Sequence, residues 1–252
     1  MMKDPRIYGI RRSLSGIRNT LCVVSGKGGV GKSTISTLMA LIAANMGLAV
    51  GLLDLDLHGP SCHVILGVGD FWYEEERGIK PYMYEGIGIV SIYPFIGERC
   101  APLRGVALSS AITELLAIIN WGRLDILIVD MPPGMGDPLL DIARYVRSLS
   151  FLVVTTGSKV SLTTVSRLLR YLIDHRYCVV GLLENMVIGA PRAESIAKHH
   201  GVRYVGSIPF DAGLEHAIGC PRKLLETKIA KTLRDLMMAD PLSRFFSKPK
   251  PI

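Results

Sequence analysis

Short apolar runs bounded by glycine alternate along the chain with longer segments in which apolar residues recur at helical spacing. The apolar runs predict strands at 21–25, 48–54, 87–92, 126–130, 151–155, 178–183 and 202–206. The helical spacing predicts helices at 33–46, 107–119, 139–149, 161–175, 193–200 and 225–238. Strands that are apolar throughout and alternate with helices indicate a parallel sheet covered on both faces. We therefore predict an α/β fold with a doubly wound, mostly parallel sheet that binds ligands at the carboxyl ends of its strands.

The two ends of the chain carry its excess positive charge. The 252 residues have a formal net charge of +7, of which residues 1–20 carry +4 and the last ten residues carry +3. Because residues 21–242 are neutral overall, we expect no basic surface for nucleic acid on the folded body. We predict a basic N-terminal extension over 1–20, one folded domain over 21–240, and a basic, proline-containing tail over 241–252, with both ends loose.

Cysteine usage and hydropathy favour a reducing compartment and no membrane span. The five cysteines are scattered and form no C-x-x-C pair, so they predict neither a disulfide framework nor a structural zinc site. The longest apolar stretch, 38–53, is interrupted by Asn45 and Gly47, and it is too short to cross a bilayer. We expect a cytoplasmic protein without a transmembrane segment.

Residues 26–33 read G-K-G-G-V-G-K-S and fit the phosphate-loop pattern G-x-x-x-x-G-K-[ST] between a predicted strand and a predicted helix. Glycines allow a turn whose backbone N–H groups converge on phosphate oxygens, and the start of the helix adds to the attraction. Lys32 is expected to contact the β- and γ-phosphates, and the Ser33 hydroxyl is expected to bind Mg²⁺. The residues predicted here to bind nucleotide are Gly26, Lys27, Gly28, Gly29, Val30, Gly31, Lys32, Ser33 and Thr34.

Carboxylates follow two of the predicted strands. Asp130 ends the run at 126–130, where it can hold Mg²⁺ beside Ser33, directly or through water. Asp54 and Asp56 follow a second run, and their spacing of two residues directs both side chains toward the pocket. One of these two acids can orient the attacking water while the other supports the metal.

The motifs together resemble those of one group of ATPases. K-G-G-V-G-K-S-T at 27–34 is similar to the deviant Walker A loop of the MinD/ParA/Mrp group. The stretches 54–61 and 130–137 resemble D-A-D-I-Y-G-P-S and D-x-P-P-G-T-G-D of the Mrp (ApbC) subgroup, with Met135 in place of the usual threonine. Further matches at 103–105, 121–125, 183–186 and 208–211 extend the resemblance over roughly residues 20–235.

This resemblance implies an ATP-hydrolysing homodimer with ATP sandwiched between the subunits. Lys27 would then contact the nucleotide of the partner subunit. The implied catalytic residues are Lys27, Lys32, Asp56 and Asp130. Asp56 would orient the water and Asp54 would lie on the metal side, although the reverse assignment is also open.

The resemblance also implies roles at the base and at the metal. In E-N-M, the amide of Asn185 would read adenine, because an amide both donates and accepts hydrogen bonds. Pro209, in the I-P-x-D loop, would flank the base. The implied magnesium ligands are Ser33, Asp54 and Asp130.

One feature of the subgroup is missing from the chain. Relatives carry C-P-x-C after E-N-M, and a dimer uses it to hold a bridging iron–sulfur cluster, but the corresponding stretch 186–192 contains no thiol. Cluster irons need thiolate ligands. Cys22 and Cys178 are predicted to be buried in core strands. The cysteines predicted in loops, where one pair per dimer could substitute, are Cys62, Cys100 and Cys220.

Two hypotheses of function follow. The first is a dimeric, Mg²⁺-dependent ATPase of the Mrp type that acts in iron–sulfur cluster assembly or transfer on apoprotein clients, with a bound cluster possible despite the missing motif. The alternative is a MinD/ParA-like switch that binds a membrane, DNA or a protein in its ATP state. In that alternative, Leu242, Phe245 and Phe246 with nearby basic residues form a weak membrane anchor.

Overall fold

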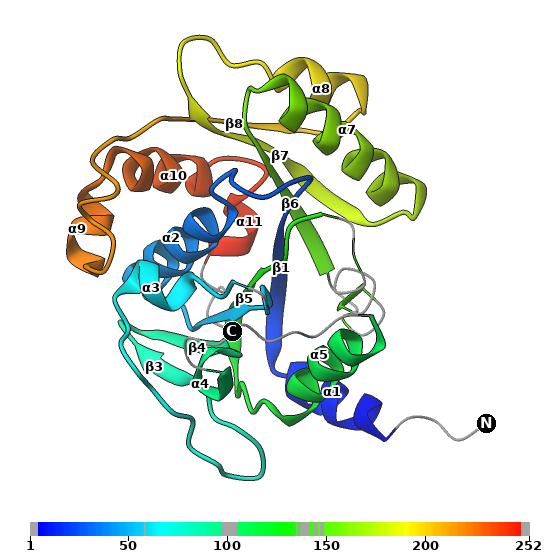
Figure 1. Cartoon of the computed structure of the whole chain (residues 1–252), viewed down its shortest axis with the longest axis vertical. Helices are drawn as coiled ribbons and strands as arrows, with labels where there is room; N and C mark the ends of the chain where they lie inside the picture. The colour runs from blue at the N-terminus through cyan, green and yellow to red at the C-terminus, as the bar shows by residue number, and fades with distance from the viewer. Residues whose placement is uncertain are drawn as a thin grey trace.

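Figure 1 shows the computed structural model, in which helices cover both faces of an eight-stranded sheet. It describes residues 5–57, 59–96, 105–134, 136, 142–143, 146 and 149–247. The strands are β1 (Ile17–Ser25), β2 (Val50–Asp54), β3 (Tyr82–Tyr84), β4 (Ile87–Ser91), β5 (Leu124–Asp130), β6 (Leu149–Thr155), β7 (Cys178–Val187) and β8 (Tyr204–Pro209). The helices are α1 (Arg6–Leu14), α2 (Lys32–Asn45), α3 (Cys62–Leu66), α4 (Tyr93–Ile96), α5 (Val106–Ile118), α7 (Lys159–Asp174), α8 (Glu194–His199), α9 (Pro221–Glu226), α10 (Lys228–Met238) and α11 (Ser243–Phe246).

The strand order confirms the predicted doubly wound sheet. The strands lie in the order β3-β4-β2-β5-β1-β6-β7-β8, and only the edge pair β3–β4 is antiparallel. The central strands β1, β2 and β5 run parallel, so their carboxyl ends meet at one edge of the sheet. In this register Asp54 at the end of β2 lies opposite Asp130 at the end of β5.

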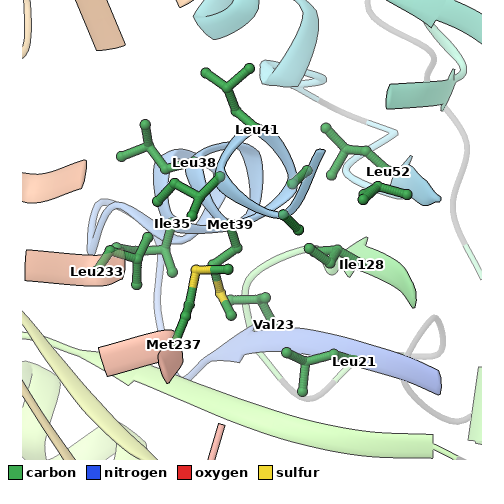
Figure 2. Close-up of a cluster of buried hydrophobic side chains, with 14 of the residues drawn as sticks. Leu21, Val23, Ile35, Leu38, Met39, Leu41, Leu52, Ile128, Leu233 and Met237 are labelled. Carbon is green, nitrogen blue, oxygen red and sulfur yellow. The ribbon is translucent and has the colours of Figure 1, made fainter. Parts of the chain in front are cut away.

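Both faces of the sheet are buried, because consecutive residues in the middle of its central strands are apolar. Along β1, Leu21 and Val23 face a core formed with α2 and α10, whereas Cys22 and Val24 face a core formed with α5 and α7. Figure 2 shows the first core, where side chains of α2 pack between Val23, Ile128 and Met237. This packing fixes α2 against the sheet and thereby positions the loop that precedes it.

The expectation of a loose N-terminal extension is wrong for the described part of 1–20. Residues 6–14 form α1, and the close approach of Gly9 to Ala117 places this helix against α5. Ile10 is 1% exposed, and the Arg6 guanidinium donates to the Ser110 hydroxyl at 2.9 Å. The sheet itself already begins at Ile17, so the predicted boundary at residue 20 falls inside β1.

The expectation of a loose tail is also wrong as far as Ser247. Leu242, Phe245 and Phe246 are at most 6% exposed and belong to the core beneath α2 and α10. Their burial contradicts the suggested membrane anchor. Residues 248–252 lie outside the described residues.

The remaining differences concern short elements and places that are not described. The sequence did not predict α1, α3, β3, α4 or α11, and the predicted helix 225–238 is divided at Thr227, whose hydroxyl accepts from the Ala230 N–H and caps α10. The predicted helix 139–149 falls mainly outside the described residues. So do these residues of the quoted motifs: His58, Cys100, Leu103, Arg104, Met135 and Asp137.

Candidate nucleotide-binding site

The phosphate-loop residues border an open depression at the carboxyl edge of the sheet. This depression has a volume of about 300 Å³. It is lined by Ser25, residues 27–34, Asp56, Ser61, Ile65 and Pro133. The loop thus lies where the fold class predicts a ligand.

Backbone N–H groups of the loop are available to a ligand. Within the described chain, none of the N–H groups of Lys27–Gly31 donates a hydrogen bond to another protein group. Gly31 has φ +80°, and a Cβ there would lie 2.4 Å from the Asn185 amide nitrogen, so no other residue fits without movement. A run of uncommitted N–H groups just before the start of α2 is an anion-binding arrangement.

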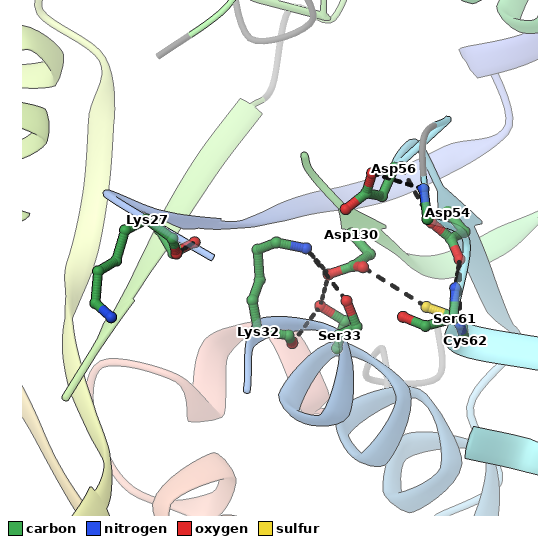
Figure 3. A network of polar contacts seen from close by, with 11 residues as sticks. Lys27, Lys32, Ser33, Asp54, Asp56, Ser61, Cys62 and Asp130 are labelled. Carbon is green, nitrogen blue, oxygen red and sulfur yellow. Dashed lines mark hydrogen bonds and ion pairs between the residues drawn. The ribbon is translucent and has the colours of Figure 1, made fainter. Parts of the chain in front are cut away.

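A buried ion pair lies directly beneath the loop. Figure 3 shows the Lys32 ammonium donating to Asp130 Oδ1, at 2.7 Å. The Ser36 hydroxyl donates to the same oxygen at 2.7 Å. Lys32 is 5% exposed and Asp130 is fully buried, so the pair is shielded from solvent. The predicted partners Lys32, Ser33 and Asp130 are therefore close together, since Lys32 also lies 3.4 Å from the Ser33 hydroxyl.

Asp54 holds the loop that follows β2. Its carboxylate accepts hydrogen bonds from the N–H groups of Asp56, Ser61 and Cys62 at 3.0–3.1 Å. Burial, and then the neighbouring charge of Asp130, raise the pKa of Asp54 to about 7 against the opposing effect of these N–H groups. Single ligand atoms from Asp54, Cys62 and Asp130 all lie within 4.8 Å of one another.

Asp54 and Asp56 do not share one position, contrary to the expectation that both acids face the pocket. Asp56 lines the depression and is partly exposed, whereas Asp54 is fully buried behind it. The reason is that β2 ends at Asp54, so the alternation of a strand does not continue to Asp56. Only Asp56 can therefore reach a ligand in the depression directly.

Lys27 has different surroundings from Lys32. It is partly exposed, and Figure 3 shows its side chain directed away from Lys32 and Asp130. The Ser25 hydroxyl donates to the Lys27 carbonyl at 2.9 Å, which fixes the backbone at the start of the loop. The side chains of the two lysines therefore point in different directions, and Lys32 is the one paired with Asp130.

Of the two residues predicted at the base, Asn185 contacts the phosphate loop. Asn185 is 1% exposed, and its amide nitrogen donates to the Val30 carbonyl at 2.9 Å. Pro209 ends β8 next to Val187 and is exposed, but it does not line the depression. The structure thus gives Asn185 a contact that sequence reasoning missed, because it braces the phosphate loop from the end of β7.

The cysteines are arranged differently from the prediction. Cys22 is buried as expected, but Cys178 is exposed at the start of β7. Cys62 is not in a loop: it begins α3 and is fully buried, which raises the pKa of its thiol. Cys220 is partly exposed just before α9.

The loop 186–192 is held by an acid rather than prepared for a metal. Glu184, 1% exposed, accepts hydrogen bonds from the N–H groups of Arg192 and Ala193 at 2.8 Å. Ile188 at the tip is 83% exposed. No thiol is present in the loop. These residues do not fit the ligand set of an iron–sulfur cluster.

Sequence reasoning also missed Ser36 and Ser61. Ser36 lies four residues after Lys32 on α2, which places both side chains on one face of the helix. That spacing was the available signal for a second donor near Asp130. Ser61 lines the depression, but its place depends on the turn held by Asp54 and has no local sequence signal.

A phosphate loop that joins the central strand to a buried helix, beside an acid on the next strand, places this chain among the P-loop nucleotide-binding proteins. The family can be named more narrowly. Residues 16–239 match the model of the ParA family described as NUBPL iron-transfer P-loop NTPase, and the chain belongs to that family.

Relatives with known names agree with this assignment. The chain is 35% identical over 226 residues to the iron-sulfur cluster carrier protein of Saccharolobus solfataricus, covering 82% of this chain and 76% of that protein. It is 34% identical over 228 residues to the cytosolic Fe-S cluster assembly factor NUBP2 of Mus musculus, covering 82% and 83%. Its fold is similar to the nucleotide-binding protein of Archaeoglobus fulgidus in complex with ADP, with a TM-score of 0.71, 26% identity and 96% and 98% coverage.

Across the described residues, every helix is either too short or too polar to cross a bilayer.

Proposed function

We propose that this chain binds ATP with magnesium at the phosphate loop and hydrolyses it, as a homodimer that acts in iron–sulfur cluster assembly or transfer. The observation that carries the proposal is the set of uncommitted N–H groups of Lys27–Gly31 above the buried Lys32–Asp130 pair. The names of the relatives support the assignment to iron–sulfur assembly. A cytoplasmic location belongs to the same proposal.

The phosphates bind first to backbone groups. The N–H groups of the loop and the start of α2 surround the phosphate oxygens, with Ser33 and Thr34 at the first turn of the helix. Lys32 exchanges its contact with Asp130 for the β- and γ-phosphates. Asn185 and Pro209 are proposed at the base; the contact of Asn185 with the phosphate loop supports its role, and the role of Pro209 rests on the resemblance.

The donor set fits magnesium, which prefers hard oxygen ligands. Ser33 offers a hydroxyl and Asp130 a carboxylate beside the same lysine, while Asp54 adds a carboxyl group within reach of Asp130. Magnesium bound there neutralises charge on the phosphates. Both Asp54 oxygens already accept backbone N–H groups of the loop between β2 and α3, the switch loop. We therefore assign Asp54 to holding this loop and to the charge on the metal side.

Hydrolysis needs a positioned water, and we assign that role to Asp56. A water oxygen bonds to the γ-phosphorus, the bond from that phosphorus to the bridging oxygen breaks, and ADP and phosphate leave. The protein contributes position and charge rather than a covalent intermediate. Asp56 lines the depression opposite the loop and is the acid that a ligand there can reach.

Lys27 is assigned to the nucleotide of the partner subunit. Its direction away from Lys32, seen in Figure 3, leaves the local phosphates to Lys32. Two chains facing each other across their phosphate loops would bring each Lys27 to the other site. ATP binding then closes the dimer, and hydrolysis opens it.

The cluster is cargo in this proposal, and its ligands do not come from loop 186–192. Among the described cysteines, Cys22 and Cys62 are buried, and Cys178 lies at the start of β7, at the other end of that strand from the loop. We therefore assign to this chain the ATP-driven step of assembly. The membrane-switch alternative loses its support, because its anchor residues Leu242, Phe245 and Phe246 are buried.

Phosphate release from MgATP tests the hydrolytic part. Asp56→Asn should lower turnover by roughly a hundredfold and leave ADP affinity unchanged, because the acid acts on the water. Asp235→Asn, at an exposed position of α10, is the matched control. Equal turnover in Asp56→Asn and wild type would contradict the role of Asp56.

Activation of apo-aconitase by iron and sulfide tests the assembly part. Wild-type chain with MgATP should accelerate recovery of aconitase activity, and Lys32→Ala should not. Equal rates with and without the wild-type chain would contradict the assembly role while leaving nucleotide binding intact.

A further inference from the structure

Two donors of α2 share one oxygen of the Asp130 carboxylate. Lys32 Nζ and Ser36 Oγ each lie 2.7 Å from Oδ1. The other oxygen, Oδ2, lies on the side of Cys62, whose Sγ is 3.8 Å away. Asp130 and Ser36 are fully buried, so solvent does not replace either contact.

The Ser36 hydroxyl has a choice of acceptors. It lies 3.1 Å from the Lys32 carbonyl of its own helix and 2.7 Å from the carboxylate. A serine within a helix often bonds to the carbonyl four residues earlier. The shorter contact to a charged acceptor is the stronger of the two, so the hydroxyl is directed to Asp130.

Lys32 and Ser36 differ in what they can do when a nucleotide binds. The long Lys32 side chain is required at the phosphates by the proposed function, and it must then release Asp130. The short Ser36 side chain has no such second task and remains beside Oδ1. After the exchange, Ser36 is therefore the donor that still holds Oδ1, while the Cys62 thiol stays beside Oδ2.

We propose that Ser36 is a positioning residue that keeps Asp130 Oδ1 hydrogen-bonded and so holds the carboxylate in one orientation, in which Asp130 would help to hold magnesium. This inference rests on the proposed nucleotide site. Partners of a metal-ligating carboxylate contribute to affinity by orienting it, and losing one typically weakens metal binding by roughly 10–100-fold. Nucleotide bound without magnesium does not use this orientation.

The test compares nucleotide binding without and with the metal in Ser36→Ala, Ser36→Thr and wild type. Calorimetry in the presence of EDTA measures the affinity for ADP without metal. The decrease in the electron paramagnetic resonance signal of free Mn²⁺ measures how much metal the protein–ADP complex binds. Ser36→Ala should keep the metal-free ADP affinity within about twofold and weaken Mn²⁺ and Mg²⁺ binding about tenfold. Ser36→Thr, which keeps the hydroxyl, should restore the metal affinity.

Thr113→Ala on α5 is the matched control. Thr113 is 4% exposed, and its hydroxyl donates to the carbonyl of Ser109, four residues earlier on the same helix, so its removal should not change metal affinity. Unfolding midpoints of all variants separate misfolding from the metal effect. Equal metal affinity in Ser36→Ala and wild type, or an equal loss of metal-free ADP binding, would overturn the role of Ser36. Absence of any nucleotide binding by wild type would instead overturn the proposed function, and this inference with it.

Discussion

The phosphate loop 26–33 and the loop 186–192 both lie at the carboxyl ends of buried strands, but only the second is anchored at its far end by a buried acid. In the first, the N–H groups of Lys27–Gly31 have no acceptor within the described chain. In the second, Glu184 binds the N–H groups of Arg192 and Ala193, which closes the end of the loop. Uncommitted donors prepare a ligand site, whereas satisfied donors make a fixed connection.

The two loops are joined at the end of β7. Asn185 donates to the Val30 carbonyl of the phosphate loop, while its neighbour Glu184 holds the other loop. The phosphate-loop site therefore contains the N–H donors, Lys32 and the acids Asp56 and Asp130 that the proposed function needs. The other side has no thiol where the resemblance suggested cluster ligands. Under the proposed function, this chain therefore supplies the ATP-driven step without cluster ligands in this loop.

Removing the lysine beneath the phosphate loop should produce the largest change. Lys32→Ala removes the charge that faces the phosphates and should weaken ATP and ADP binding by more than roughly a hundredfold in calorimetry. It also leaves Asp130 buried without its ion pair, so the free energy of unfolding should fall by about 3 kcal/mol. Lys80→Ala is the control, since Lys80 pairs with Glu74 and Glu76 at the surface. Nucleotide affinity equal to wild type would contradict the account.

The other lysine of the phosphate loop, Lys27, should affect dimerisation and ATP turnover rather than nucleotide affinity. Lys27→Ala should keep ADP affinity nearly unchanged, because Lys27 is directed away from the local site. It should lower ATP turnover by roughly a hundredfold and abolish ATP-dependent dimerisation, measured by sedimentation, since a missing positive charge destabilises the charged transition state. Lys231→Ala on α10 is the exposed control. Unchanged turnover and dimerisation in Lys27→Ala would remove the sandwich arrangement.

A smaller effect is expected from the acid that holds the switch loop. The pKa of Asp54 is raised from 3.8 to about 7 by burial and by Asp130, with Lys32 opposing. The native state therefore retains a proton that the unfolded chain releases, and stability falls as the pH rises through that window. Relative to wild type, Asp54→Asn should gain about 2 kcal/mol in free energy of unfolding between pH 5 and pH 8.

Denaturant unfolding at both pH values measures this difference in the nucleotide-free protein. Asp235→Asn, at an exposed site, should show no pH-dependent gain. A difference between Asp54→Asn and wild type that is the same at pH 5 and pH 8 would show that Asp54 is not held protonated in the native state.

The smallest effect belongs to the loop 186–192. Anaerobic reconstitution with iron and sulfide should give no cluster absorbance and no bound iron that depends on this loop, because it has no thiolate. Ile188→Ser, at an 83% exposed position, should change neither iron content nor ADP affinity. Cluster iron that the wild-type chain binds and that Ile188→Ser loses would contradict this view of the loop.

Much of the fold was predictable because the central elements have strong local patterns. The apolar runs identify the buried parts of β1, β5 and β6, and the helical spacing identifies α2 and α7 by the faces that they bury. By contrast, α1 and α11 pack through few residues, such as Ile10 and Phe246, and their surroundings are polar and basic. The basic charge of both ends favoured a prediction of loose segments, whereas tertiary contacts of a few apolar side chains hold α1 and α11 in place.

The site residues were predictable where a local sequence motif or the end of an apolar strand marks them. Lys32 and Asp130 follow from the motif and from the end of an apolar strand, and the structure brings them together. The separation of Asp54 from Asp56 depends on where β2 ends, which the sequence pattern does not set. The burial of Cys62 and the bracing contact of Asn185 depend on residues distant in sequence, so no local signal shows them.

The most direct test of the account is calorimetric titration of the intact wild-type chain with ATP and with ADP, in the presence of magnesium. The uncommitted N–H groups at 27–31 predict a saturable heat that corresponds to one nucleotide per chain. Absence of any heat of association with adenine or guanine nucleotides would contradict the central claim.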